Sequence, residues 1–320
     1  MKKLFLIITL LAFMTACGGG KQNENTDNTN DSSTTTSTEG TNTASGDENK
    51  ANSVTQGKLL SKEEVGTAKE YTSIAEVEGE ADKSIIIRYR PKDYAKEFPT
   101  KLLEANNLQV LVLQNYGAAT LPDDIKKFKN LTVLFIDGAS SLEKLPESIG
   151  ELKNLKTVSL GGCKKLDIAQ VLGVLKNCPN LENLSLSFIP FTEMPATIGE
   201  LKNLKHLRIK NNKFKTLPDE FYKLENLEYL AIGSNPKEPY NYEEIFTKMK
   251  DLPKLKTLFF PYSGLKALPD VMKDYPALKK VAWKESDWKD VKTETKKWDD
   301  KFPNFEVTWS TSSTPMYYFY

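Results

Sequence analysis

The stretch LPESIGELKNLKTVSLGGC, residues 145–163, decides the fold of this chain. Close variants recur as LPDDIKKFKNLTVLFIDGA (121–139), MPATIGELKNLKHLRIKNN (194–212) and LPDEFYKLENLEYLAIGSN (217–235). The prolines at 99, 122 and 146, and those at 195 and 218, lie 23 or 24 residues apart, and the gaps from 146 to 195 and from 218 to 269 hold two units each. Such a period indicates a solenoid, because one unit is too small to bury its apolar face alone and must stack on its neighbours.

Each copy divides into a short strand and a return segment. In the copy at 194–212, Leu207 and Ile209 alternate with polar residues, as in a strand with one buried face. In the preceding half, Ile198, Leu201 and Leu204 recur at three-residue spacing, which suits a helical or 3₁₀ return. The repeat therefore predicts an α/β solenoid, with a parallel concave sheet and helical or 3₁₀ returns on the convex side.

Eight aligned copies begin near residues 98, 121, 145, 168, 194, 217, 243 and 268. In these copies the chain resembles leucine-rich repeat proteins of the short LPxxIxxLxNLxxLxLxxN type. The units near 168 and 243 lack Leu-Pro and its Phe-Pro or Met-Pro variants. Asp167 with Gln170 and Asn241 with Glu244 predict true helices there, the first with a capping box. The position after each strand, usually Asn or Cys in this family, holds Tyr116, Ala139, Cys163, Ile189, Asn212, Asn235, Ser263 and Ser286, so we expect an irregular ladder.

The first residues predict export and a lipid anchor. Lys2 and Lys3 precede a short apolar run, and MTAC at 14–17 resembles the lipobox of bacterial lipoproteins, in which the cysteine, here Cys17, is acylated. An ordinary signal peptide with an incidental cysteine is the alternative. Between Cys17 and Val54 the only apolar side chains are two alanines, so this segment should be a disordered tether. We expect a bacterial envelope protein, with the outer membrane or cell surface favoured, that meets the membrane through its lipid alone.

The expected organisation is a signal peptide at 1–16, a tether at 17–57, an N-terminal cap at 58–97, repeats at 98–287, and a C-terminal cap with an aromatic tail at 288–320. The first cap should contain a helix around Ile74 and Val77 and then a strand through 85–89. The second should contain a helix, a strand at 305–309, and Trp288 and Trp298 packed over the last repeat. The tail PMYYFY either packs on that cap or serves as a docking peptide.

Composition argues against several classes of function. A formal net charge of +1 disfavours a dedicated nucleic-acid binder. One histidine, with no close set of Cys, His and carboxylate residues, makes a zinc site or a histidine-dependent triad improbable. Cys163 and Cys178 should be small buried thiols rather than a disulfide or a nucleophile. We therefore expect no enzyme activity, no metal and no cofactor.

The strand residues that do not face the core predict the binding surface. They form two columns on the concave face: Val110, Val133, Thr157, Asn183, His206, Tyr229, Thr257 and Lys280 in the first, and Val112, Phe135, Ser159, Ser185, Arg208, Ala231, Phe259 and Ala282 in the second. Because these side chains should be free of packing duty, aromatic and basic residues among them are informative. The candidate ligand-binding residues are Phe135, His206, Arg208, Lys210, Tyr229, Phe259 and Tyr262.

The lysine-rich unit KNLKHLRIKNNKFK, residues 202–215, has two interpretations. It is either a solvated face or an electropositive band for an acidic protein loop or an anionic glycan. His206 is better read as a contact residue than as a catalytic base. The resemblance implies a non-enzymatic, membrane-anchored protein that mediates protein–protein interaction through its concave face. The alternative is a glycan-binding or adhesive surface lipoprotein.

Overall fold

The computed structural model describes residues 58–233, 240–283, 285 and 290–308. The expected signal peptide, Cys17, the tether, Trp288 and the aromatic tail all lie outside these residues. The fold below is that of the described part of the chain.

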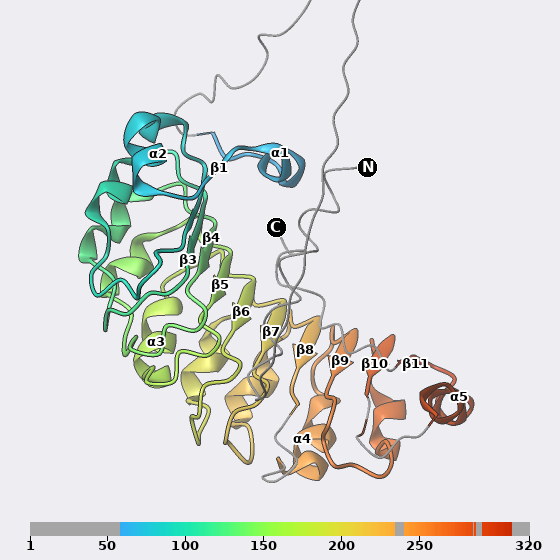
Figure 1. Cartoon of the computed structure of the whole chain (residues 1–320). Helices are drawn as coiled ribbons and strands as arrows, with labels where there is room; N and C mark the ends of the chain where they lie inside the picture. Colours follow the sequence, from blue (N-terminus) through green and yellow to red (C-terminus); the bar gives the residue numbers. More distant parts are fainter. Residues whose placement is uncertain (1–57, 234–239, 284, 286–289, 309–320) are drawn as a thin grey trace, which may run out of the picture. The chain divides into compact units, whose positions relative to one another are not determined.

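The strands form one parallel sheet in which neighbours in sequence are neighbours in space, from β1 to β11 (Figure 1). Their bounds are β1 Glu70–Tyr71, β2 Ile86–Tyr89, β3 Val110–Leu113, β4 Val133–Phe135, β5 Thr157–Ser159, β6 Asn183–Ser185, β7 His206–Arg208, β8 Tyr229–Ala231, β9 Thr257–Phe259, β10 Lys280–Ala282 and β11 Glu306–Thr308. This order is the arrangement predicted for stacked repeats.

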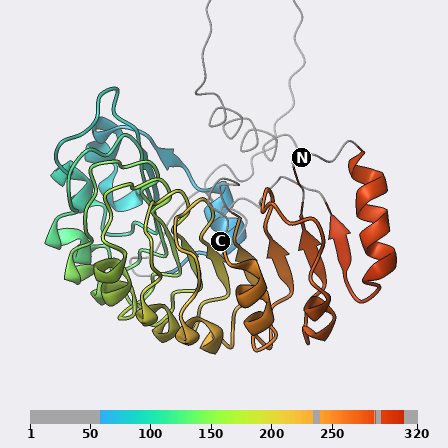
Figure 2. The ribbon, with the colours of Figure 1, turned by 90° about the horizontal axis from the view of Figure 1, so that it is seen from below.

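Apart from α1, the helices and 3₁₀ segments return the chain along one side of this sheet (Figure 2). The helices are α1 Lys62–Thr67, α2 Ile74–Gly79, α3 Ile168–Leu175, α4 Tyr242–Met249 and α5 Val291–Lys301. The 3₁₀ segments are η2 Ala81–Lys83, η3 Thr100–Glu104, η4 Asp123–Lys127, η5 Glu147–Glu151, η6 Ala196–Glu200, η7 Asp219–Lys223 and η8 Asp270–Asp274. We call the opposite side of the sheet the open face.

The predicted strand register is confirmed. Leu184, Leu207 and Leu230 are paired across β6, β7 and β8, and all three are fully buried between the sheet and the returns. The residues on either side of them pair within the two predicted columns, for example His206 with Tyr229. One short alternation per repeat therefore fixes which side chains enter the core.

The units near residues 168 and 243 contain true helices, α3 and α4, as predicted. Asp167 caps α3 by accepting a hydrogen bond from the Gln170 backbone N–H at 3.1 Å. The predicted capping box is wrong in its second half, because the Gln170 side chain bonds both backbone groups of Leu145 in the preceding repeat. Asn241 caps α4 through the Glu244 backbone N–H. The cap residues thus begin the helices and also fasten one repeat to the next.

The predicted irregular ladder is accompanied by a second, regular one. After β7, Asn212 accepts from the Ile189 N–H at 2.8 Å and donates to the Leu186 carbonyl at 3.0 Å. At the far end of the returns, an Asn that directly precedes a Leu donates to a carbonyl of the preceding repeat. Asn154, Asn203 and Asn226 stand in Leu-x-Asn-Leu runs, and Asn180 stands in Cys-Pro-Asn-Leu. Side-chain amides therefore satisfy turning backbone at both ends of the repeat.

The predicted caps close both ends of the described stack. At the start, α2 and β2 occupy the expected positions, while β1 and α1 were not predicted. At the other end, α5 and β11 follow the last repeat, and the Trp298 ring packs edge-on against Trp283 with centroids 5.5 Å apart. The burial of Trp298 agrees with its predicted role as a lid on the core.

Candidate functional site

The open face is divided into two separate apolar clusters. The N-terminal cluster contains Ile85, Ile86, Val110, Val112, Val133 and Phe135, and Leu60, Val65 and Ala68 pack against it. The central cluster contains Tyr229, Ala231, Phe259 and Ala282. The first cluster is therefore closed by the chain's own segment before β1. The described members of the second all come from the sheet.

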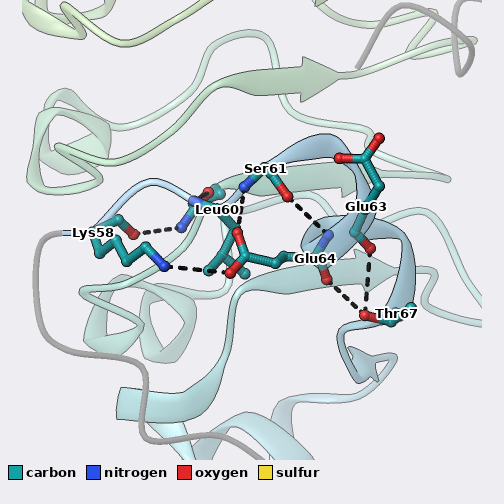
Figure 3. Close-up of polar contacts among 7 residues, drawn as sticks. Lys58, Leu60, Ser61, Glu63, Glu64 and Thr67 are labelled. Carbon is teal, nitrogen blue, oxygen red and sulfur yellow. Dashed lines mark hydrogen bonds and ion pairs between the residues drawn. The ribbon is translucent and has the colours of Figure 1, made fainter.

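Gln109 fastens that N-terminal segment to the open face. Its side-chain amide accepts from the Leu60 N–H at 3.0 Å and donates to the Lys58 carbonyl at 3.1 Å, while the side chain itself is buried. The segment continues into α1, where Ser61 and Glu64 form a reciprocal capping box (Figure 3). One buried amide with both of its functions bonded thus holds the chain across the first strands.

This arrangement corrects part of the prediction for the open face. The expectation that the column residues are free of packing duty is wrong for Val110, Val112, Val133 and Phe135, which are core residues of the N-terminal cluster. It is also wrong for the four buried residues of the central cluster, which include the predicted site residues Tyr229 and Phe259. Phe135 is only 3% exposed. Its aromatic ring therefore packs within the N-terminal cluster, apart from the other candidate residues at β7–β9.

In the central cluster, two cations lie over two aromatic rings. The Arg208 guanidinium carbon lies 5.0 Å from the centroid of the Tyr229 ring. The Lys210 Nζ lies 4.9 Å from the centroid of the Phe259 ring. Arg208 and Tyr229 are only 6% and 7% exposed, while Lys210 is half-buried. Each of these geometries is within the range of a favourable cation–π contact.

Burial tunes the charges at this cluster. It lowers the pKa of the Arg208 guanidinium, which nevertheless stays protonated because its ordinary value is so high. Burial, with a smaller contribution from the charge of Arg208, lowers the pKa of Lys210 to about 8. Both groups are therefore mainly cationic at neutral pH. Two positive charges held on an apolar floor suit the recognition of an anionic group.

His206 ends a polar row that crosses three strands. Asn183 donates from its amide nitrogen to Thr157 Oγ1 at 2.9 Å, and its amide oxygen lies 2.6 Å from His206 Nδ1. That oxygen requires a donor, so Nδ1 carries the proton. Burial, opposed only in part by the carboxylate of Glu228, lowers the pKa of His206 to about 4. The imidazole is therefore neutral near pH 7 and acts as a positioned polar contact.

The structure brings together most of the predicted site residues. His206, Arg208, Tyr229 and Phe259 share the open face of β7–β9, and Lys210 lies at the exit of β7. Tyr262 lies past the exit of β9, in a turn at the sheet edge. The polar row of Thr157 and Asn183 was missed as part of the site, although both residues stand in the first predicted column. Two adjacent hydrogen-bonding residues in one column were the available signal.

The remaining reactive groups have structural roles. Cys163 donates to the Ile136 carbonyl at 3.0 Å, and Cys178 donates to the Ile149 carbonyl at 3.4 Å. Burial raises the pKa of Cys163 to about 12 and that of Cys178 to about 11. Both are free, buried thiols, which confirms the prediction and makes them poor nucleophiles at neutral pH.

Within 58–233, 240–283, 285 and 290–308, no group of three His, Cys, Asp or Glu side chains has an arrangement suited to a metal ion. Over the same residues, none of the helices combines the length and apolar character that a membrane span requires.

Comparisons with known proteins agree with this geometry. The family pattern "Leucine rich repeat" matches residues 176–236, and "R13L1/DRL21 LRRs" matches residues 82–163. Disease resistance protein RPS4B of Arabidopsis thaliana is 38% identical over 71 residues, which are 22% of this chain and 6% of that protein. Disease resistance-like protein DSC1 of the same plant is 29% identical over 93 residues, 29% of this chain and 8% of that protein. The chain thus spans less than a tenth of the length of these relatives.

Solved structures of similar proteins include two from bacteria. A leucine-rich repeat protein of Leptospira interrogans has a TM-score of 0.42 at 19% identity, covering 68% of this chain and 66% of that one. Internalin C2 of Listeria monocytogenes has a TM-score of 0.48 at 19% identity, covering 64% and 83%. Because both halves of the repeat region match leucine-rich repeat patterns and the parallel strands stack in sequence order, the described part of the chain is a leucine-rich repeat solenoid.

Proposed function

We propose that this chain is a non-enzymatic binding protein that holds a protein partner on the open face of β7–β9. The observation that carries the proposal is the central cluster, where Arg208 and Lys210 lie over the rings of Tyr229 and Phe259. A leucine-rich repeat solenoid is suited to protein–protein interaction, and Arg and Tyr are frequent anchors of such interfaces. The neutral His206 adds a directional polar contact beside them.

We also propose that the chain is a lipoprotein of a bacterial envelope, on the outer membrane or the cell surface. This proposal is supported by the sequence alone: Lys2 and Lys3, the apolar run after them, and the lipobox-like MTAC that ends at Cys17. The polar tract after Cys17 would hold the solenoid away from the lipid headgroups. Metabolic labelling with a fatty-acid analogue should mark the wild-type chain and not Cys17→Ser. Label that survives in the variant would refute the anchor.

The binding proposal is tested by affinity capture from envelope extracts. The full-length chain should enrich a protein partner, and Arg208→Ala and Tyr229→Ala should each weaken that purified interaction by about 1–3 kcal/mol. Raising salt to about 0.5 M should also weaken it, because the cations would then be screened. Lys223→Ala, on the return side, is the matched control and should change nothing. A partner whose affinity ignores Arg208 and Tyr229 would place binding elsewhere.

A further inference from the structure

The turns that follow β3–β7 and β9 each contain a residue with a left-handed backbone at the third position after the last open-face residue of the strand. These residues are Asn115, Gly138, Gly162, Phe188, Asn211 and Tyr262, with φ between 52° and 77°. Glycine and asparagine adopt this conformation readily. A bulky side chain does not, and costs roughly 1–2 kcal/mol there. Phe188 and Tyr262 are therefore the two exceptions to the residue choice that this turn favours.

Neither exception is explained by packing of the ring. Phe188 is 55% exposed and Tyr262 is 39% exposed, so neither ring is buried in the core. Two independent costs, a strained backbone and an exposed ring, therefore coincide at both positions. Residues kept in unfavourable backbone conformations cluster at functional sites.

Ring stacking and hydrogen bonds with neighbouring turns hold the turns that contain Phe188 and Tyr262. Phe191, Phe214 and Tyr240 form a stack with ring centroids 5.4 and 4.4 Å apart. The Lys213 N–H donates to the Phe191 carbonyl at 3.0 Å, which ties two successive turns together. Glu285 does the same after β9, accepting from the backbone N–H groups of the turn that contains Tyr262. The turns that contain Phe188 and Tyr262 are therefore preorganised, which lowers the entropy cost of binding a partner there.

Charge at the strand exits is unbalanced. The described turn segments 187–194, 210–216 and 261–267 carry four lysines and one acidic residue, Glu193. Lys213, Lys215 and Lys266 are exposed and make no ion pair with any described residue. At the opposite, strand-start edge, cations are paired from repeat to repeat. Lys205 bonds Glu182 at 3.0 Å, and Lys256 bonds Glu228 at 2.9 Å. Lys213, Lys215 and Lys266 are thus less neutralised by described carboxylates than Lys205 and Lys256.

We infer that Phe188, Tyr262, Lys213, Lys215 and Lys266, together called the exit edge, bind an acidic protein segment that carries apolar side chains. The inference rests on the proposed binding function and adds the chemistry of the partner. The two rings lie on turns three strands apart, about 14 Å at 4.8 Å per strand. An extended segment covers that distance in about four residues. The partner segment would place two apolar residues four positions apart, with Asp or Glu between them.

The test uses a defined probe, the fluorescein-labelled peptide Asp-Phe-Glu-Asp-Glu-Phe-Asp, and the full-length chain. Fluorescence polarisation should show binding to the wild type that weakens at least about tenfold in the Phe188→Asn, Tyr262→Asn double variant. Asparagine is chosen because it fills the same turn at 115 and 211, so the fold is retained. Tyr94→Asn, which removes a ring that is 61% exposed elsewhere, is the matched control and should bind normally.

Charge is tested in the same assay. Lys213→Glu with Lys266→Glu should abolish detectable binding, while Lys250→Glu, at the end of α4, should bind like the wild type. A peptide with Lys in place of its acidic residues should not bind. Absence of wild-type binding below about 1 mM, or equal losses in edge and control variants, would overturn the inference. If binding ignored the exit edge but fell in Arg208→Ala, the exit edge would be refuted and the proposed function retained.

Discussion

Substituting Gly199 tests how tightly successive returns stack. A Cβ atom at this position, in η6, would lie 2.5 Å from the Glu220 carbonyl oxygen and 2.7 Å from the Glu220 Cβ in η7. The obstruction is largely backbone, so no side chain can rotate away and the two returns must separate. Overpacking of this kind typically costs about 1–3 kcal/mol, and we expect Gly199→Ala to lower the free energy of unfolding by that amount.

Gly173, which also lies in a return segment, provides a matched control. It lies within α3, and a Cβ there would have no other atom within 4 Å. Alanine in a helix interior is favoured over glycine by about 1 kcal/mol, so Gly173→Ala should raise the free energy of unfolding slightly. Urea denaturation followed by circular dichroism measures the change in the free energy of unfolding for both variants. If Gly199→Ala proved neutral or stabilising, the stacking distance between the two returns would be wrong.

Three further outcomes are expected. Leu207→Ala, at a fully buried strand position, should cost about 2–5 kcal/mol in urea denaturation, while Lys213→Ala, in an exposed turn, should cost under about 0.5 kcal/mol; equal losses would refute the register. His206 is the one histidine of the chain, so its proton NMR titration is unambiguous and should give a pKa of about 4 against 6.5 for the free side chain. Because the unfolded chain then binds the proton first, stability should be complete above about pH 6.5 and fall as the pH drops toward about 4; His206→Gln should remove this component, and a normal pKa would contradict it. Gln109→Ala should release Lys58 and Leu60, seen as faster amide exchange of the Leu60 N–H, whereas Asn154→Ala should leave that exchange unchanged.

The sequence was sufficient for the features that repeat. Each strand of the stack appears as a short apolar alternation, and eight copies in one register leave little freedom in the pairing. The helices α3 and α4 were predictable because Asp167 and Asn241 stand where an N-cap is required. The second asparagine ladder was also within reach, since Leu-x-Asn-Leu recurs at the period of the repeat. Regular patterns are visible because each copy supports the interpretation of the others.

Features that occur once were not predictable. The segment from Lys58 to Ala68 has only a few apolar residues and no period, yet it packs on strands far along the chain. Its anchor, Gln109, is a single polar residue 49 positions from Leu60. The contact of Arg208 with the Tyr229 ring was equally hidden, because adjacent columns do not reveal which way a long side chain bends. Such contacts depend on tertiary geometry that one sequence does not display.

The division of the open face limits where a partner can bind. The strands β2–β4 carry mainly aliphatic side chains on that face, and their own N-terminal segment covers them. Arg88 of β2 also lies on that face, and it is paired with Glu70 at 2.9 Å. From β7 onward the same columns hold His206, Arg208 and Tyr229, and the turns beside them hold the lysines of the exit edge, which make no ion pair with a described residue. Apolar residues in this solenoid therefore close the first repeats, while cationic and aromatic residues are concentrated in the later ones. Because salt-sensitive recognition depends on charges that remain available to a partner, the proposed acidic segment would bind at the later repeats.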